Sequence, residues 1–171
     1  MLFEWINRIS KLHNPLRPPG AVKEHEFVDT CIRCRKCEEV CPYQSIKMLN
    51  GVHGTKMGTP VIISRETPCY LCEDFPCVDV CPSDALRQVK TNKDVKMGIA
   101  KIDKDTCFAF NGILCRACFE RCPIYREGIV MENQLYPKVQ EEYCVGCGIC
   151  ENVCPTENGS IFVESRHPIV V

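Results

Sequence analysis

The sequence predicts a small, irregular α+β fold made from a repeated unit of strand, cysteine-rich loop, short helix and strand. Sixteen cysteines form four groups, and the first cysteines of these groups are 38, 38 and 37 residues apart. A constant interval of this length indicates an internal repeat. A short apolar or β-branched run follows each group, and a similar run precedes the last three groups. Each cysteine-rich loop is therefore expected to lie between two short strands.

The expected strands fall on both sides of the cysteine groups. Strands after the groups are predicted at residues 45–49, 85–89, 128–131 and 160–163, and strands before groups two to four at residues 61–63, 99–102 and 136–139. Two successive units give the order βαββαβ, which is the ferredoxin-like motif. We therefore expect two ferredoxin-like modules.

Composition limits the classes of function. The chain has 171 residues, with 21 basic and 22 acidic side chains, and this balance predicts no nucleic-acid partner. No run of about 18 apolar residues is present, so no transmembrane helix is expected. The first twenty residues contain neither an apolar signal-peptide core nor a twin-arginine pair, which favours a cytoplasmic location, with peripheral membrane contact as an option.

The first and fourth cysteine groups have the spacing of bacterial ferredoxins. Both follow the pattern Cys-x2-Cys-x2-Cys-x3-Cys-Pro, which is typical of [4Fe–4S] ligation, with the fourth cysteine binding the neighbouring cluster. The groups consist of Cys31, Cys34, Cys37 and Cys41, and of Cys144, Cys147, Cys150 and Cys154.

The second and third groups are variants of the same pattern. The second widens the middle gap to four residues and the third widens the first gap to seven, but both keep the last gap and the proline. They consist of Cys69, Cys72, Cys77 and Cys81, and of Cys107, Cys115, Cys118 and Cys122. All sixteen cysteines are thus predicted to bind four [4Fe–4S] clusters.

Other uses of the cysteines fit less well. Structural zinc sites use separate Cys-x2-Cys pairs, often with histidine, whereas His13, His25, His53 and His167 lie outside the groups. Four disulfide-bonded cysteines within eleven residues would form strained short loops. No dinucleotide-binding, Walker or nucleophile motif is present. The chain is therefore expected to be an electron carrier without a nucleotide cofactor, and not an enzyme.

The N-terminal segment, residues 1–20, is predicted to be an amphipathic helix followed by a proline-rich linker. Apolar residues recur at helical spacing up to Leu12, and prolines follow from Pro15. Two interpretations remain open: the helix packs on its own module, or residues 1–14 dock on a membrane surface or on a partner.

Six stretches of the sequence resemble the NapG/MauM family of ferredoxin-type proteins. They are residues 17–21, 58–60, 65–69, 73–77, 97–100 and 111–118, and the resemblance extends over about residues 17–165. It implies that all sixteen cysteines bind four [4Fe–4S] clusters, which carry electrons from a membrane quinol-oxidising partner toward a terminal reductase. Members of this family typically carry a twin-arginine signal, so the resemblance makes the periplasm the alternative location.

A related type of protein suggests how the groups pair. In four-cluster subunits of molybdenum oxidoreductases the groups pair in nested order, first with fourth and second with third, and the shared spacings here are compatible with this order. Nested pairing implies one module of residues 21–59 and 136–171 and another of residues 60–135, with sequential pairing as the alternative. The implied clusters are Cys31, Cys34, Cys37 and Cys154; Cys144, Cys147, Cys150 and Cys41; Cys69, Cys72, Cys77 and Cys122; and Cys107, Cys115, Cys118 and Cys81. An iron–sulfur subunit of a molybdenum oxidoreductase or hydrogenase is the alternative function.

Charged residues differ between the first two groups. Arg33, Arg35 and Lys36 surround the first, whereas Glu73, Asp74 and Asp79 surround the second. Because positive charge favours the more negative reduced cluster, unequal reduction potentials are expected.

Overall fold

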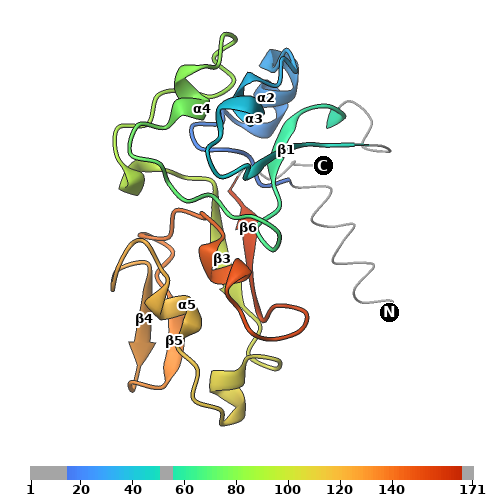
Figure 1. Cartoon of the computed structure of the whole chain (residues 1–171). Coiled ribbons are helices and arrows are strands. Elements are labelled where there is room, and N and C mark those ends of the chain that lie inside the picture. The colour runs from blue at the N-terminus through green and yellow to red at the C-terminus, as the bar shows by residue number, and fades with distance from the viewer. Residues whose placement is uncertain (1–14, 51–55, 167–171) are drawn as a thin grey trace.

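The computed structural model describes residues 15–50 and 56–166 and divides them into two halves (Figure 1). The N-terminal half holds α2, α3, β1, β2 and α4, and the C-terminal half holds β3 to β6 with α5 and α6. The elements of the first half, with the 3-10 helix that follows it, are α2 (Glu24–Thr30), α3 (Lys36–Val40), β1 (Ile46–Met48), β2 (Pro60–Ile62), α4 (Pro76–Asp79) and η2 (Asn92–Asp94). Those of the second half are β3 (Gly98–Ile102), η3 (Phe108–Asn111), α5 (Ala117–Glu120), β4 (Ile129–Glu132), β5 (Tyr136–Val139), α6 (Ile149–Asn152) and β6 (Ile161–Ser165).

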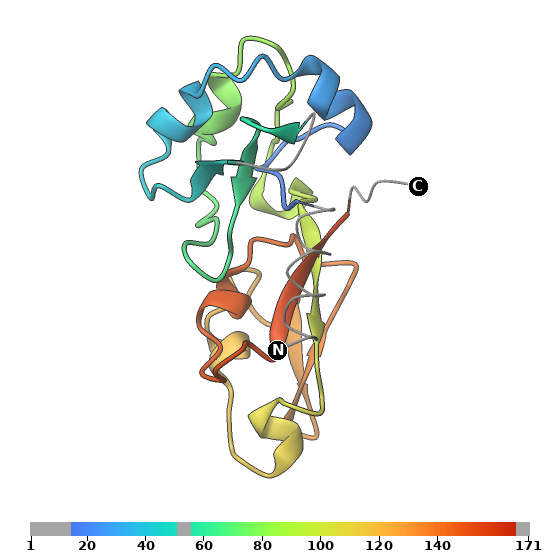
Figure 2. The same cartoon turned by 90° about the vertical axis from the view of Figure 1, so that its right-hand side faces the viewer.

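The C-terminal half has strand and helix elements in the order β3, α5, β4, β5, α6, β6. Its outer strands β3 and β6 pair antiparallel, and so do its inner strands β4 and β5. The β3–β6 register places Ala100 opposite Val163 and Ile102 opposite Ile161. Figure 2 shows the two outer strands running side by side. Ala100, Val163 and Ile161 are buried, so this strand pair presents an apolar side to the core.

The N-terminal half repeats this arrangement with a shorter outer pair. Its inner strands β1 and β2 pair antiparallel, with Ile46 opposite Ile62. Its outer pair is a single bridge between Ala21 and Leu86, so the strand expected at residues 85–89 does not form. Pro18 and Pro19 precede this bridge and have no backbone N–H to donate to a longer ladder.

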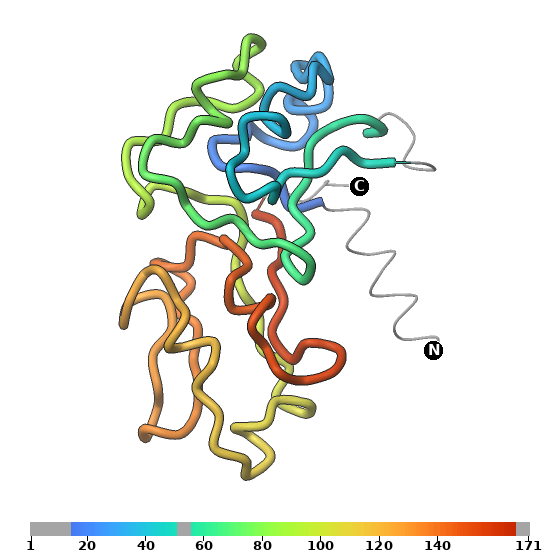
Figure 3. Tube along the Cα trace, in the orientation of Figure 1, coloured from blue at the N-terminus to red at the C-terminus, as the bar shows by residue number. Residues whose placement is uncertain are grey.

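The division of the chain differs from the one expected from nested pairing. The tube in Figure 3 runs through one half from its blue end to green and then through the other half in yellow, orange and red. Helix α3 packs against α4, and α5 packs against α6. Successive units of the chain thus pack on each other in the described residues. This packing differs from the predicted module of residues 21–59 with 136–171 and from the predicted second module of residues 60–135.

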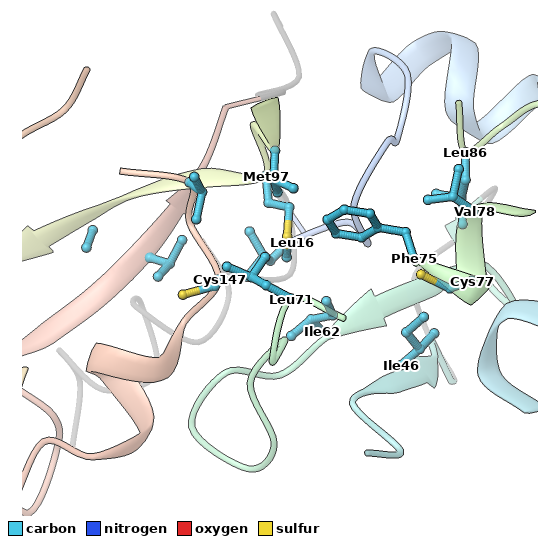
Figure 4. Packing of buried hydrophobic residues seen from close by; sticks show 14 of the residues in the cluster. Leu16, Ile46, Ile62, Leu71, Phe75, Cys77, Val78, Leu86, Met97 and Cys147 are labelled. Atoms are coloured by element: carbon cyan, nitrogen blue, oxygen red, sulfur yellow. The ribbon is translucent and has the colours of Figure 1, made fainter. Parts of the chain in front are cut away.

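One apolar core continues through both halves. Figure 4 shows its central part, where Leu16, Leu71 and Met97 lie between Cys147 of the C-terminal half and Cys77 of the N-terminal half. Leu71 is 5 % exposed and Met97 is 2 % exposed. The two halves are thus packed together through buried side chains.

The described helices are all too short or too polar to cross a bilayer. The N-terminal helix predicted before residue 15 lies outside the described residues, so the two interpretations of it stay predictions.

Candidate iron–sulfur sites

The sixteen cysteines surround four cavities, four to each cavity. Each cavity has a volume of about 330–360 Å³, counting the part that is open to solvent. We call them sites A to D. Site A is lined by Cys31, Cys34, Cys37 and Cys81; site B by Cys41, Cys69, Cys72 and Cys77; site C by Cys107, Cys115, Cys118 and Cys154; and site D by Cys122, Cys144, Cys147 and Cys150.

This arrangement differs from the nested pairing. Each cavity takes three cysteines from one group and the last cysteine of the neighbouring group, as in two-cluster bacterial ferredoxins. Cys81 completes the set begun by Cys31, and Cys154 completes the set begun by Cys107. Groups one and two therefore share sites A and B, and groups three and four share sites C and D. Spacing alone could not decide this, because groups one and four have identical gaps.

Left-handed backbone conformations turn the cysteine loops toward their cavities. In the first group Arg33 and Arg35 have φ values of 58° and 65°. Gly146 and Gly148 occupy the same positions of the fourth group, with φ values of 74° and 84°. Such values are rare for residues other than glycine, and here they reverse the chain between successive cysteines so that three thiols face one cavity.

The last cysteine of each group is directed by the proline that follows it. Proline cannot continue the preceding helix, and a residue with positive φ turns the chain a few positions later. These residues are Gln44, Asp84, Arg126 and Gly159. The last cysteine thus reaches the neighbouring cavity before the chain enters the next strand or bridge.

The third group reaches the same geometry by a longer route. Its seven-residue gap contains the 3-10 helix η3, which ends at Gly112 with φ of 79°. The side-chain amide of Asn111 donates to the carbonyl oxygens of Lys104, Asp105 and Cys107. This closed loop keeps Cys107 and Cys115 at the same cavity.

Burial makes most of these thiols poor acids. It is the largest cause that raises the pKa of Cys37, Cys77, Cys118 and Cys147 to about 12. Neighbouring cysteines raise these pKa values further, since thiolates repel one another. Four thiolates at one cavity therefore need bound cations, and this is the donor set that an iron–sulfur cluster takes. The residues present fit a [4Fe–4S] cluster.

Two of the crossing cysteines are in a more polar environment. Burial also disfavours the thiolate of Cys81, but hydrogen bonds from the backbone of Leu86 and Ser83 outweigh it and lower its pKa. The same balance lowers the pKa of Cys154, where Thr156 supplies hydrogen bonds from its hydroxyl and backbone. These two thiols are the donors that each reach across to the other group of their half.

Backbone amides also donate to cysteine sulfurs elsewhere. The amide of Ser45 donates to Cys41 Sγ and the amide of Ala100 donates to Cys144 Sγ, both at 3.4 Å. Hydrogen bonds of this kind stabilise thiolate ligands and influence the potential of an iron–sulfur cluster.

Histidine does not join the cavities in the described residues. His25 is exposed on α2, and the other three histidines lie outside the described residues. Between residues 15–50 and 56–166, no three His, Cys, Asp or Glu side chains lie close enough together to hold a single metal ion.

Two arginines near the sites were not predicted as functional residues. Arg17 is fully buried and donates to both carboxylate oxygens of Glu24, at 2.8 and 2.7 Å. Its guanidinium lies over the ring of Phe27, which lines site A. Arg65 binds backbone carbonyls of the other half. A single arginine carries no periodic signal, so only the folded chain identifies these contacts.

Two regions of the chain match the family described as 4Fe-4S dicluster domain. The matches cover residues 30–85 and 100–161. The first range contains the cysteines of sites A and B, and the second contains those of sites C and D.

The chain is also similar to curated proteins over most of its length. It is 39 % identical to the ferredoxin-type protein NapG of Escherichia coli over 160 residues, which cover 86 % of this chain and 69 % of NapG. It is 37 % identical to the methylamine utilization ferredoxin-type protein MauM of Methylorubrum extorquens, over 88 % of this chain and 73 % of MauM. The identity to MauM of Paracoccus denitrificans is 36 %, over 88 % of this chain and 71 % of that protein.

Proposed function

The chain belongs to the NapG/MauM family of ferredoxin-type proteins, and on that premise we propose that it is an electron carrier with four [4Fe–4S] clusters in two βαββαβ modules. The modules correspond to the two halves of the structure. Each cluster supplies a one-electron couple when bound. The protein itself binds the clusters through cysteine thiolates and shields them from water. It adjusts their reduction potentials through N–H donors and nearby charge.

The main observation in support of this proposal is that the sixteen cysteines divide into four complete sets. Each set lines its own cavity, and no cysteine remains outside the sets. A structural zinc protein has no need for one cysteine of each group to cross to a neighbouring set, whereas two-cluster ferredoxins have this exchange. We propose the four sets at sites A to D as the ligands.

The arrangement of the sites supports an order for the relay. Sites B and D meet at the junction of the halves, where the backbones of Cys69 and Cys147 are hydrogen bonded. Site A is lined by the loop between α2 and α3, at the far end of the N-terminal half (Figure 1). Site C is lined by η3, by α5 and by the turn after α6, and of these the turn contacts the N-terminal half, through Arg65. The proposed order is A, B, D and C, in either direction.

The outer sites are the ones that exchange electrons with other proteins. Cys34 of site A is the one exposed cysteine among the sixteen, all of which lie in the described residues. Next to Cys115 of site C, Ile113 is 54 % exposed and Leu114 is 73 % exposed. We propose that a membrane quinol-oxidising protein and a terminal oxidoreductase dock at these two ends.

A redox titration followed by a donor experiment tests this function. Anaerobically purified protein should take up about four electrons per chain, one per cluster, and release them again when reoxidised. Membranes supplied with a quinol should reduce it as well. A protein that takes up no electrons reversibly contradicts the carrier function. Reduction by dithionite but not by quinol-supplied membranes contradicts the proposed donor.

A further inference from the structure

The cysteine loops of sites B and D are in direct contact across the junction of the two halves. The backbone N–H of Cys69 in site B donates to the carbonyl oxygen of Cys147 in site D at 2.9 Å. The side chain of Leu71, which follows Cys69 in the loop, is buried beside Cys147 (Figure 4). A single hydrogen bond in an apolar environment thus connects the cysteine sets of the two halves directly.

Arg65 holds the segment just before this contact. One guanidinium nitrogen, Nη1, donates to the carbonyl oxygens of Glu151 at 2.8 Å and Cys154 at 2.9 Å. The other, Nη2, donates to the carbonyl oxygens of Thr156 at 2.8 Å and Glu157 at 3.4 Å. These carbonyls lie in the last turn of α6 or just after it, where no backbone N–H of the helix is available to them. One side chain of the N-terminal half therefore binds the end of α6, which carries Cys150 of site D, and the turn that follows it, which carries Cys154 of site C.

Asn152 returns the contact from the C-terminal half. Its side-chain amide donates to the carbonyl oxygens of Arg65 at 3.1 Å and Glu66 at 3.4 Å. Gly148 lies against Ser64, since a Cβ at Gly148 would be 2.2 Å from Ser64 Oγ. We call Arg65, Asn152 and the carbonyls that they bind the Arg65 clamp.

We propose that Arg65 is a positioning residue that fixes the separation of sites B and D and so sets the coupling between the two halves. The inference rests on the proposed function, because coupling has a meaning only when clusters occupy these sites. Electron exchange between redox centres falls steeply with their separation, and the Arg65 clamp joins the loop of Cys69 to the helix that carries Cys150. A planar guanidinium with a rigid fork of donors can hold several carbonyls at once, whereas a lysine ammonium cannot.

Substitutions can separate the positioning effect of the Arg65 side chain from the effect of its charge. Arg65→Gln removes the fork and the charge, Arg65→Lys keeps the charge without the fork, and Asn152→Ala removes the return contact without changing charge. Arg87→Gln is the matched control, because Arg87 is an exposed arginine whose ion pair with Glu26 stays within the N-terminal half.

The readouts are structural and spectroscopic, and are made on anaerobically purified, cluster-loaded protein. In the Arg65 variants, we expect the EPR spectrum of the fully reduced protein to change toward the sum of two independent halves. We also expect the amide of Cys69 to exchange hydrogen about tenfold faster, as for the loss of one charge-assisted hydrogen bond. Asn152→Ala should show the same changes to a smaller extent, and Arg87→Gln should show neither.

The outcomes distinguish this inference from the proposed function. Unchanged coupling and unchanged Cys69 exchange in Arg65→Gln would overturn the inference while leaving the carrier function intact. Wild-type coupling and wild-type Cys69 exchange in Arg65→Lys would also overturn it, since the positive charge alone would then suffice. If Arg65→Gln loses clusters, Asn152→Ala provides the test: a change in coupling and in Cys69 exchange supports the inference, and no change in either overturns it. Absence of clusters from the wild-type protein would count against the proposed function.

Discussion

Gly146 packs directly on the backbone of Gly98 where the two halves meet. A Cβ at Gly146 would lie 2.2 Å from the nitrogen and 2.5 Å from the Cα of Gly98. The neighbouring amide of Met97 donates to the carbonyl oxygen of Val145 at 3.1 Å. The glycine therefore serves two purposes: it allows φ of 74°, and it leaves room for β3 beside the loop of site D.

Gly146→Ala is expected to destabilise the protein and to reduce the cluster content of site D. Alanine would be strained at positive φ by about 1 kcal/mol, and its Cβ would displace the backbone of Gly98. Gly112→Ala is the control, because Gly112 has φ of 79° but a Cβ there would meet no atom within 4 Å. Urea unfolding and iron content should show a larger loss for Gly146→Ala. Equal losses would mean that backbone strain alone matters.

Replacing Arg17 should be costly because it leaves Glu24 buried without its main partner. Removal of one member of a buried ion pair costs about 3–5 kcal/mol. Lys56 lies 3.7 Å from Glu24 and partly compensates for the lost charge. The loss of stability in Arg17→Ala is therefore expected near the lower end of this range. The double variant Arg17→Met with Glu24→Leu should regain much of the lost stability, measured by denaturant unfolding. A loss below about 1 kcal/mol for Arg17→Ala, as for exposed pairs, would contradict this account.

Pairs of cysteine substitutions test the cluster assignments. Cys31→Ser with Cys81→Ser affects one site, so iron should fall to about twelve per chain. Cys31→Ser with Cys154→Ser affects sites A and C, and iron should fall to about eight. The nested pairing predicts the opposite order of the two iron contents.

Sites A and B should differ in reduction potential. Arg35 and Lys36 are exposed beside site A, whereas Glu73 and Asp74 are exposed beside site B. Site A is expected to have the higher potential, because positive charge stabilises the reduced cluster. Arg35→Glu with Lys36→Glu should lower one potential in an EPR-monitored titration, and the effect should shrink in high salt. Lys104→Glu with Arg121→Glu, in the other half, is the control, and an equal shift of the same potential in it would refute the assignment.

Removal of the clusters should unfold the protein. Cysteines of all four sites belong to the apolar core or pack against it, and metal-binding free energy is folding free energy in proteins of this kind. Treatment with a chelator under oxidising conditions should abolish the native far-UV circular dichroism spectrum of the protein and its cooperative thermal transition. A compact apo-protein with native circular dichroism would show that the apolar core suffices.

Local patterns in the sequence predict most of the elements. The runs at residues 99–102, 136–139 and 160–163 become β3, β5 and β6 to within two residues. The run at residues 85–89 had a similar composition, but its partner segment contains Pro18 and Pro19, so only one bridge forms. Local apolar content predicts a strand, whereas pairing also requires N–H donors on the opposite segment.

The sites themselves were predictable only in part. The gaps between cysteines identify the ligand type and predict a number of clusters. Cys41 and Cys154, however, have the same local sequence pattern and yet lie at sites B and C. Which cavity the last cysteine reaches depends on the packing of α3 on α4 and of α5 on α6. The Arg65 clamp depends on residues more than 80 positions apart, and no spacing rule indicates such a contact.

Iron and acid-labile sulfide content, measured on anaerobically purified protein together with its reduced-state EPR spectrum, tests the central claim most directly. The account predicts about sixteen iron and sixteen sulfide per chain, with a spectrum of interacting reduced clusters. Zinc without sulfide, or about twelve iron with one site empty, would contradict it.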